Sequence, residues 1–289
     1  MIAMVLDVVI GGLLMGGIYA LIAVGLSLQY GVARVLNISH GEFIMLGAFV
    51  TWSLYTLFGI TPLASIVVCG AVVFVIGFVL HRTLYSRIRA LSESLAIFEG
   101  NSLLASFGLL FIIQNMAILM WGGEIRGYSY LAFPVDFWGA TFAANRLVTL
   151  LFAVLIGTAF YMFLARTRLG KAIRAAAQDL VAAGLMGVNI DHVLALCFGF
   201  GAAMAGMAGS LISMSYMISP VMGMEYTVIA IIVVVLGGLG SIPGSFIGGL
   251  LLGLVGSLVS YVQPGLSLAA YYVLFMLLLL VRPTGIMRR

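Results

Sequence analysis

The chain has 289 residues, of which 64% are hydrophobic and only 8% are charged, and its mean hydropathy is +1.25. This composition excludes an ordinary soluble domain. The net charge of +4 follows the membrane orientation worked out below and does not indicate nucleic acid, so we expect no nucleic-acid partner.

Apolar stretches of the length that crosses a bilayer recur along the whole chain. They predict an all-α, polytopic integral membrane helical bundle in a single domain, residues 1–289, with about nine transmembrane helices and eight to ten left open. The N-terminus, Met1 to Asp7, has no basic region, so the first stretch is interpreted as a retained span and not a signal peptide. The expected spans are 8–30, 39–58, 62–80, 102–121, 147–165, 193–218, 226–242, 245–262 and 267–281.

The seventh span, 226–242, is the least certain to cross the membrane, because glycines interrupt its apolar run. Only Tyr226 to Leu236 is free of glycine, which is too short to cross the membrane alone. A half-helix is therefore the alternative to a full crossing.

Two polar or glycine-rich interruptions predict discontinuous helices, near 31–41 and near 237–244. Irregular backbone at membrane depth survives only where protein or a water-filled cavity satisfies its polar groups. Paired broken segments in the two halves of a membrane protein point to a transport pathway. We assign that pathway to Asn37, Ser39, His40, Gly41, Glu42, Gly237, Gly238 and Gly240.

Two roles are open for Glu42. Ser39 and Glu42 have the spacing of a capping box, in which each side chain covers a free amide at the start of a helix. Capping does not explain Asn37 and His40, and ionisable groups at such depth are functional candidates.

The segment 168–187 is expected to form a short amphipathic helix between two spans. Its apolar face carries Leu169, Ile173, Ala176 and Leu180, and its polar face carries Lys171, Arg174 and Gln178. A surface helix held at anionic lipid headgroups is one interpretation. Its many alanines favour the other, a docking element for a cytoplasmic protein.

The basic residues set the expected orientation. With nine spans, all but Arg126 and Arg146 lie on one side, which predicts an outer N-terminus and a cytoplasmic C-terminus. The residues on the cytoplasmic side are then Arg34, Arg82, Arg87, Arg89, Arg166, Arg168, Lys171, Arg174, Arg282, Arg288 and Arg289. The role of the loop 82–100 stays open.

The sequence offers little support for catalysis. It contains no nucleophile–base pair, no cluster of metal ligands and no phosphate-binding glycine loop. Cys69 and Cys197 lie inside apolar runs and are expected to be small buried hydrophobes. Glycines four residues apart, such as Gly12/Gly16 and Gly249/Gly253, predict close helix packing.

Three segments resemble the signatures of the LivH-type permease subunits of branched-chain amino acid ABC importers, in the same order along nearly the whole chain. They are Gly25-Leu26-Ser27-Leu28-Gln29-Tyr30-Gly31-Val32 with Val35 to Phe43, the segment Ala172 to Asn189, and Val233 to Gly244. The resemblance implies a second related permease subunit, two cytoplasmic ATPase subunits and a periplasmic or extracellular solute-binding protein as partners. It also implies a bacterial inner membrane, with no cofactor bound by this chain because ATP and magnesium belong to the ATPases.

The resemblance further implies an ATPase-coupling loop in this chain. We assign it to Arg168, Gly170, Lys171, Arg174, Gln178, Asp179 and Gly187. Related permeases carry urea or short amides, which are the alternative solutes. A proton-coupled secondary transporter using His40 and Glu42, or a membrane scaffold without transport, are the rival functions.

Overall fold

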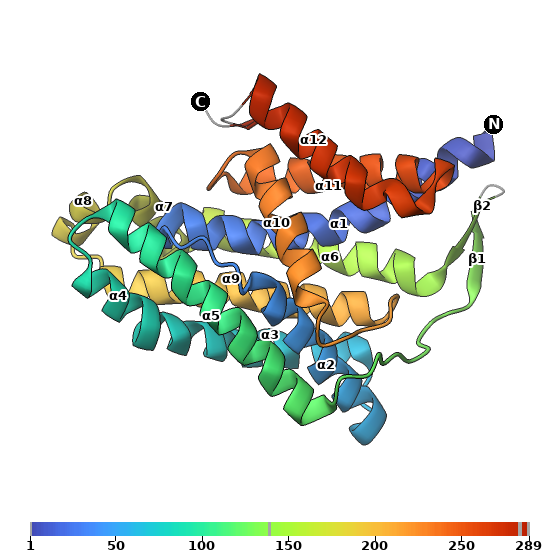
Figure 1. The fold of residues 1–289 in the computed structure, drawn as a ribbon, viewed down its shortest axis with the longest axis horizontal. Helices are drawn as coiled ribbons and strands as arrows, with labels where there is room; N and C mark the ends of the chain where they lie inside the picture. Colours follow the sequence, from blue (N-terminus) through green and yellow to red (C-terminus); the bar gives the residue numbers. More distant parts are fainter. Residues whose placement is uncertain (1, 138–139, 283–284, 288–289) are drawn as a thin grey trace.

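The computed structural model describes residues 2–137, 140–282 and 285–287, and almost all of them are helical (Figure 1). One short antiparallel hairpin, β1 Pro134–Phe137 and β2 Ala140–Ala143, precedes α6. The predicted all-α bundle is confirmed. The helices are α1 Ile2–Ala33, α2 His40–Phe58, α3 Pro62–Leu80, the π-helical turn η1 His81–Tyr85, α4 Ser86–Leu91, α5 Leu95–Trp121, α6 Ala144–Arg166, α7 Arg168–Gln178, α8 Leu180–Leu185, α9 Ile190–Ser213, α10 Gly223–Gly237, α11 Ile242–Val262, η2 Pro264–Leu266 and α12 Ser267–Val281.

Within the described residues, 8 helices are long and apolar enough to cross a membrane. The additional apolar helix, α10, has 15 residues and is therefore about 22 Å long, short of a full crossing. The alternative of a half-helix for 226–242 is thus the better description. Four other predicted ends are wrong by five residues or more. The helix α1 begins at Ile2 rather than 8, and α5 begins at Leu95 rather than 102. The helix α3 continues through η1 and α4 to Leu91 rather than ending at 80, and α9 ends at Ser213 rather than 218.

Two groups of three helices have matching packing arrangements. The most extensive helix contacts are those of α1 with α11 and of α3 with α9, which correspond if α1, α2 and α3 are matched with α9, α10 and α11. In Figure 1, α1 runs from the N-terminal end of the bundle towards α7, and α9 runs the opposite way. The arrangement is that of an inverted-topology repeat.

This correspondence changes how the two breaks are related. The break after α1, residues 34–39, matches the connection 214–222 after α9. The turn 238–241 instead matches the turn 59–61 between α2 and α3, and both lead into a helix with proline in its first turn. The sequence analysis paired 31–41 with 237–244 as one break in each half, whereas the helix contacts match each of them with a different connection.

Glycines let the central helices meet backbone to backbone. A Cβ atom on Gly25 of α1 would lie 2.6 Å from the Gly201 carbonyl oxygen, and one on Gly201 of α9 would lie 2.5 Å from the Gly25 oxygen. Added Cβ atoms on Gly12 and Gly253 would likewise collide with the facing helix. The four-residue spacing of Gly12/Gly16 and Gly249/Gly253 is therefore confirmed as a packing signal between α1 and α11.

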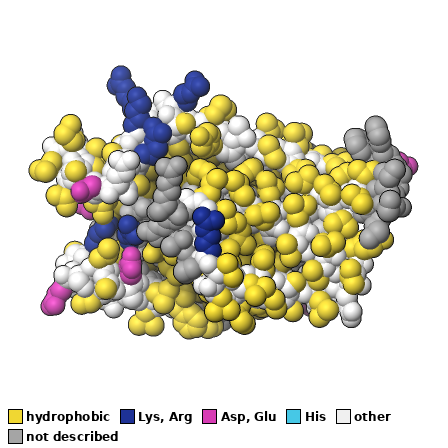
Figure 2. Space-filling model, turned by 90° about the horizontal axis from the view of Figure 1, so that it is seen from above, with side chains coloured by type: hydrophobic (Ala, Val, Ile, Leu, Met, Phe, Trp, Pro, Cys, Tyr) yellow, Lys and Arg dark blue, Asp and Glu magenta, His cyan; other side chains and the backbone are white. Residues whose placement is uncertain are grey.

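Charged side chains are concentrated at one end of the bundle. In Figure 2 the Lys and Arg side chains lie in the left half of the view, and an apolar surface covers most of the rest. The exposed apolar residues include many of α5, α6 and α12, which fits lipid contact. Cys69 and Cys197 are free and fully buried, as predicted.

Candidate translocation and coupling sites

The first break lies in the centre of the bundle. After Ala33 the chain leaves helical geometry, Arg34 adopts a left-handed φ of 57°, and α2 begins only at His40. The N-terminal ends of α2 and α10 meet there, and the two helices diverge from that point (Figure 1). The side chains of Asn37, Ser39, His40 and Glu42 are all fully buried.

A chain of hydrogen bonds links this break to α1 and α9. The Gln29 side-chain amide donates to the Phe198 carbonyl at 3.1 Å, and the Asn37 amide donates to Gln29 Oε1 at 3.2 Å. The Ser39 hydroxyl and backbone amide both donate to Asn37 Oδ1, at 2.6 and 3.1 Å. Asn37 therefore has a clear role in satisfying irregular backbone at membrane depth.

Thr227 of α10 connects the two ends of the break. Its hydroxyl accepts from the Gly41 amide at 2.8 Å and donates to the Ile38 carbonyl at 2.9 Å. The Ile38 amide donates to the Ser106 hydroxyl of α5 at 3.1 Å. Sequence reasoning assigned no role to Gln29, Ser106 or Thr227. Ser106 lies within an apolar run, whereas Gln29 and Thr227 have polar neighbours in the sequence.

The capping-box alternative for Ser39 and Glu42 is wrong. Ser39 is the residue before α2, but its side chain makes no cap bond. Its hydroxyl donates to Asn37 Oδ1, and the same oxygen accepts from the Ser39 amide that Glu42 would cover in a capping box. Neither carboxyl oxygen of Glu42 has a hydrogen-bond partner among the described residues. The carboxyl group lies against Gly223, where an added Cβ would overlap it, at the N-terminal ends of both α2 and α10. Helix N-termini carry partial positive charge, which favours a carboxylate there.

His40 is also held inside the protein. Its Nε2 lies 3.1 Å from the Ile22 carbonyl oxygen of α1, so Nε2–H donates to that oxygen and Nδ1 has no partner in the described part of the chain. Since His40 and Glu42 are fully buried, neither faces an open channel in this conformation.

The second break forms a separate site. Gly238 and Gly240 have positive φ angles of 102° and 81°, and Gly240 packs against Gly31 near the end of α1. The opposite end of α10, at Gly223, is the one that meets Glu42. The structure therefore brings Asn37 to Glu42 together, and Gly237 to Gly240 together, but does not join the two groups.

The second break shares a cavity of about 320 Å³ with the predicted coupling helix. Arg174 and Gln178 of α7 line it from one side, and Gly31 and Gly240 line it from the other. Sequence reasoning treated coupling and pathway residues as distinct groups. The fold places these members of the two groups at one cavity.

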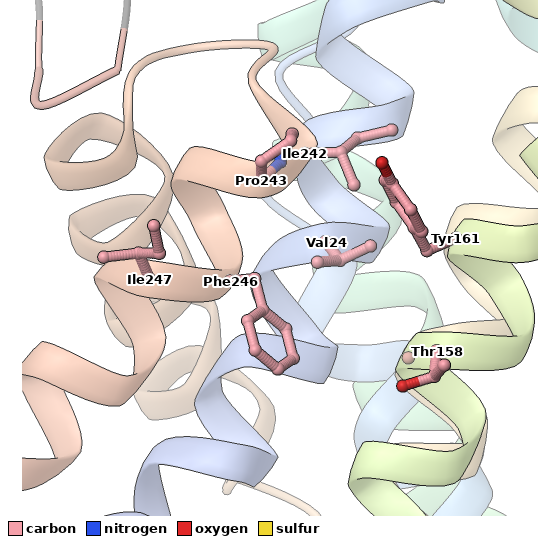
Figure 3. Close-up of a pocket in the computed structure, with 8 residues that line it drawn as sticks. Val24, Thr158, Tyr161, Ile242, Pro243, Phe246 and Ile247 are labelled. Carbon is pink, nitrogen blue, oxygen red and sulfur yellow. The ribbon is translucent and has the colours of Figure 1, made fainter. Parts of the chain in front are cut away.

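A second, mostly apolar pocket of about 310 Å³ lies beside this cavity, between α1, α6 and α11 (Figure 3). Ile242 and Pro243 line both spaces. Thr158 and Tyr161 supply its polar side chains (Figure 3). Ile242 and Pro243 belong to the break near 237–244 that the sequence marked. The other lining residues were not singled out, because a residue within a span gives no sign in the sequence that it borders a cavity.

The segment 168–187 is amphipathic as predicted, but it forms two helices, α7 and α8. Ile173 and Ala176 are buried, whereas Lys171 and Arg174 are exposed. The break occurs at Asp179, whose carboxylate accepts from the amides of Val181 and Ala182 at 2.8 and 3.0 Å and so caps α8.

The glycines of this segment have identifiable structural roles. Gly170 is buried, and a Cβ there would overlap the Leu164 backbone at the end of α6. Gly187 follows α8 with a φ of 86°, in the left-handed region that favours glycine. Of the predicted coupling residues, Arg168, Lys171, Arg174 and Gln178 present their side chains at the surface.

Comparison with known proteins identifies the family. Residues 8–282 match the family model described as the permease component of the branched-chain amino acid transport system. The chain is 33% identical to the high-affinity branched-chain amino acid transport system permease proteins LivH of Salmonella typhimurium and Escherichia coli K12, covering 96% of this chain and 94% of each relative. It is 32% identical to BraD of Pseudomonas aeruginosa, covering 98% of this chain and 96% of BraD. The chain is therefore a multi-pass membrane protein that belongs to the branched-chain amino acid transport permease family.

Proposed function

We propose that this chain is a transmembrane permease subunit of an ABC importer for branched-chain or related amino acids. The observation that carries the proposal is the match over almost the full length to LivH and BraD permeases. ATP hydrolysis would then take place on other polypeptides, and the chain would have no catalytic activity of its own.

The proposed complex contains a second related permease, two cytoplasmic ATPases and a solute-binding protein outside the cytoplasmic membrane. We place the end that carries α7 and α8 in the cytoplasm and the N-terminus outside. The concentration of basic residues at that end supports this orientation, because Lys and Arg are retained preferentially on the cytoplasmic side.

The coupling mechanism that we propose uses α7 as the contact for an ATPase. Lys171 and Arg174 are exposed on one face, while Ile173 is buried on the other, and α7 contacts α1, α6 and α9. An ATPase that binds two conformations of α7 with different affinities would shift the permease between them. The cavity beside Gly31 and Gly240 gives α7 space to move relative to α1.

The residues proposed for the pathway have different parts in this mechanism. Asn37, Ser39, His40, Gly41 and Glu42 hold the inner ends of α2 and α10, so they would control whether the centre opens. Gly237, Gly238 and Gly240 would allow α10 and α11 to pivot beside α7.

Solute uptake by cells that carry the genes for all proposed subunits of the importer tests the proposal. Deletion of this chain is expected to abolish uptake of radiolabelled leucine, and rescue should require ATPases that hydrolyse ATP. Loss of urea or short-amide uptake instead of leucine uptake would reassign the solute within the family. Uptake that survives ATPase inactivation and follows the proton gradient would refute the ABC assignment.

A further inference from the structure

A cleft has a volume of about 510 Å³. The elements that form it meet at the end of the bundle opposite α7 (Figure 1). The cleft is formed by the connection after α5, the first turn of α6 and the connection after α9. Its volume lies in the range of roughly 300–1,000 Å³ that is typical of small-molecule sites. The lining residues are Ile125, Arg126, Gly127, Tyr128, Ser129, Ala132, Asn145, Met214, Ser215, Tyr216 and Met217.

Arg126 is the only charged residue that lines this cleft, as far as the chain is described. Its backbone pairs with Ile218 in both directions at 2.8 Å, and its guanidinium carbon lies 4.5 Å from the ring centre of Trp52. One terminal nitrogen donates to the Trp121 carbonyl at 2.5 Å. The buried Nε has no partner among the described residues. Arg126 is thus held in place with unused hydrogen-bond donors.

The same cleft contains unused acceptors. Asn145 is only 8% exposed, and its Nδ2 donates to the Met214 carbonyl at 2.8 Å, which identifies Oδ1 as the free atom. That oxygen and the Ser215 hydroxyl are buried without partners in the described structure. Buried polar atoms are normally paired, and those that are not call for an explanation such as an absent ligand.

The cleft also has an apolar part. Ile125 and Met217 are 68% and 77% exposed, so they present apolar surface at its rim, and Met214 and Ala132 line it as well. A ligand that used every part of this lining would carry an anionic group, a donor group and an aliphatic side chain.

We propose that this cleft binds a free aliphatic amino acid on the outer face of the permease. Arg126 pairs with the carboxylate, because a guanidinium matches a carboxylate in shape and charge. Asn145 Oδ1 and the Ser215 hydroxyl accept from the ammonium group, and the aliphatic side chain contacts Met214 and Met217. The inference rests on the proposed function and adds to it a receiving site on this chain.

Equilibrium binding of radiolabelled L-leucine to the purified permease–ATPase complex in lipid nanodiscs, without solute-binding protein, tests the site. Leucinamide lacks the carboxylate and 4-methylpentanoate lacks the ammonium group. Each is expected to compete at least about tenfold less well than leucine, because each leaves buried polar groups of the site unpaired. Equal competition by either compound would overturn the assignment of that group.

Three variants separate the site from effects on folding. Arg126→Gln is expected to weaken leucine binding by about tenfold or more, since it removes a charge-assisted pair. Met217→Trp fills the cleft from an exposed position and leaves Arg126 intact, so it should also weaken binding. Ser215→Ala removes a hydroxyl without a partner in the described fold and should weaken binding less. The matched controls Arg87→Gln and Met276→Trp, exposed elsewhere on the chain, should bind as wild type does.

Three outcomes distinguish this proposal from the proposed function. Intact ATP-driven leucine uptake with the binding protein, but no leucine binding without it, would overturn the cleft site and leave the importer standing. If Arg126→Gln weakens only the capture of leucine-loaded binding protein, the cleft receives an acidic side chain of that protein, and the proposal is overturned. Failure of leucine uptake in the wild-type system would refute the proposed function itself.

Discussion

Replacing Thr227 by valine tests whether the centre of the bundle depends on the link between α10 and the first break. Valine has nearly the same shape as threonine but cannot bond to the Gly41 amide or the Ile38 carbonyl. Both backbone groups belong to the junction between irregular chain and α2, and Thr227 is 1% exposed, so water does not replace the hydroxyl. The variant therefore leaves two buried polar groups without their side-chain partner.

The expected loss can be bounded from two sides. A buried group left unpaired costs about 1–3 kcal/mol. Single side-chain hydrogen bonds in membrane proteins average about 0.6 kcal/mol and reach about 1.7. With two bonds lost, we expect Thr227→Val to lower the free energy of unfolding by about 1.5–4 kcal/mol.

The two native cysteines provide the assay. Cys69 and Cys197 are both fully buried, so a thiol-reactive dye reports unfolding of the purified chain in detergent. Thr149→Val is the matched control, because Thr149 is equally buried but its hydroxyl makes, within the described residues, a single long bond of 3.5 Å to the Leu211 carbonyl. Thr227→Ser should retain most of the stability. A Thr227→Val variant as stable as Thr149→Val would refute the link.

Further predictions concern coupling, helix packing and capping. Charge reversal at Lys171 and Arg174 should lower both leucine uptake and coupled ATP hydrolysis. The amount of the chain in the membrane, measured by immunoblot, should stay unchanged. Normal uptake would argue against α7 as the ATPase contact. Gly253→Val should reduce stability in the dye assay by several kcal/mol, because its side chain would collide with α1, whereas Gly108→Val, with open space around it, should have little effect. Asp179→Ala should cost about 1 kcal/mol through loss of the α8 cap, and Asp179→Asn should retain most of it, which thermal unfolding of the two variants would show.

Hydrophobicity predicted the spans well because each span satisfies its own backbone and needs only length and apolarity to be recognised. The short α10 was also foreseen, since glycines limit its apolar run to Tyr226–Leu236. The continuation of α3 to Leu91 was missed. Arg82, Arg87 and Arg89 in the sequence suggested a loop, but long basic side chains are compatible with a helix that extends beyond the apolar layer.

The sequence predicted the position of the central break but not the hydrogen-bond partners that hold it. The polar run marked the break, yet Gln29, Ser106 and Thr227 could not be assigned as its partners, because two of them lie 68 and 189 residues away from Ile38. The Ser39–Glu42 spacing favoured a capping box. Asn37 Oδ1, only two residues earlier, accepts from the Ser39 amide in place of the Glu42 carboxylate, and the spacing alone does not show which of these two acceptors bonds the amide.

The repeat was not recognisable from the sequence for a similar reason. Its halves share small residues at crossing points and a proline after a short turn, as in Thr61-Pro62 and Ser241-Ile242-Pro243, rather than extended identity. Gly25 and Gly201 show this most clearly, since each leaves room for the other only once α1 and α9 cross.

This packing limits where the molecule can change shape. At the crossing of α1 and α9 the backbones touch, and closely packed interiors shift between discrete arrangements rather than deform gradually. The turn at Gly238 and Gly240 is less constrained than this crossing, because it combines two glycines of positive φ with an adjoining cavity of about 320 Å³. We therefore expect α7 to act on the end of α1 and on this turn first, and to reach the buried group around Glu42 only through movement of α10 as a rigid helix.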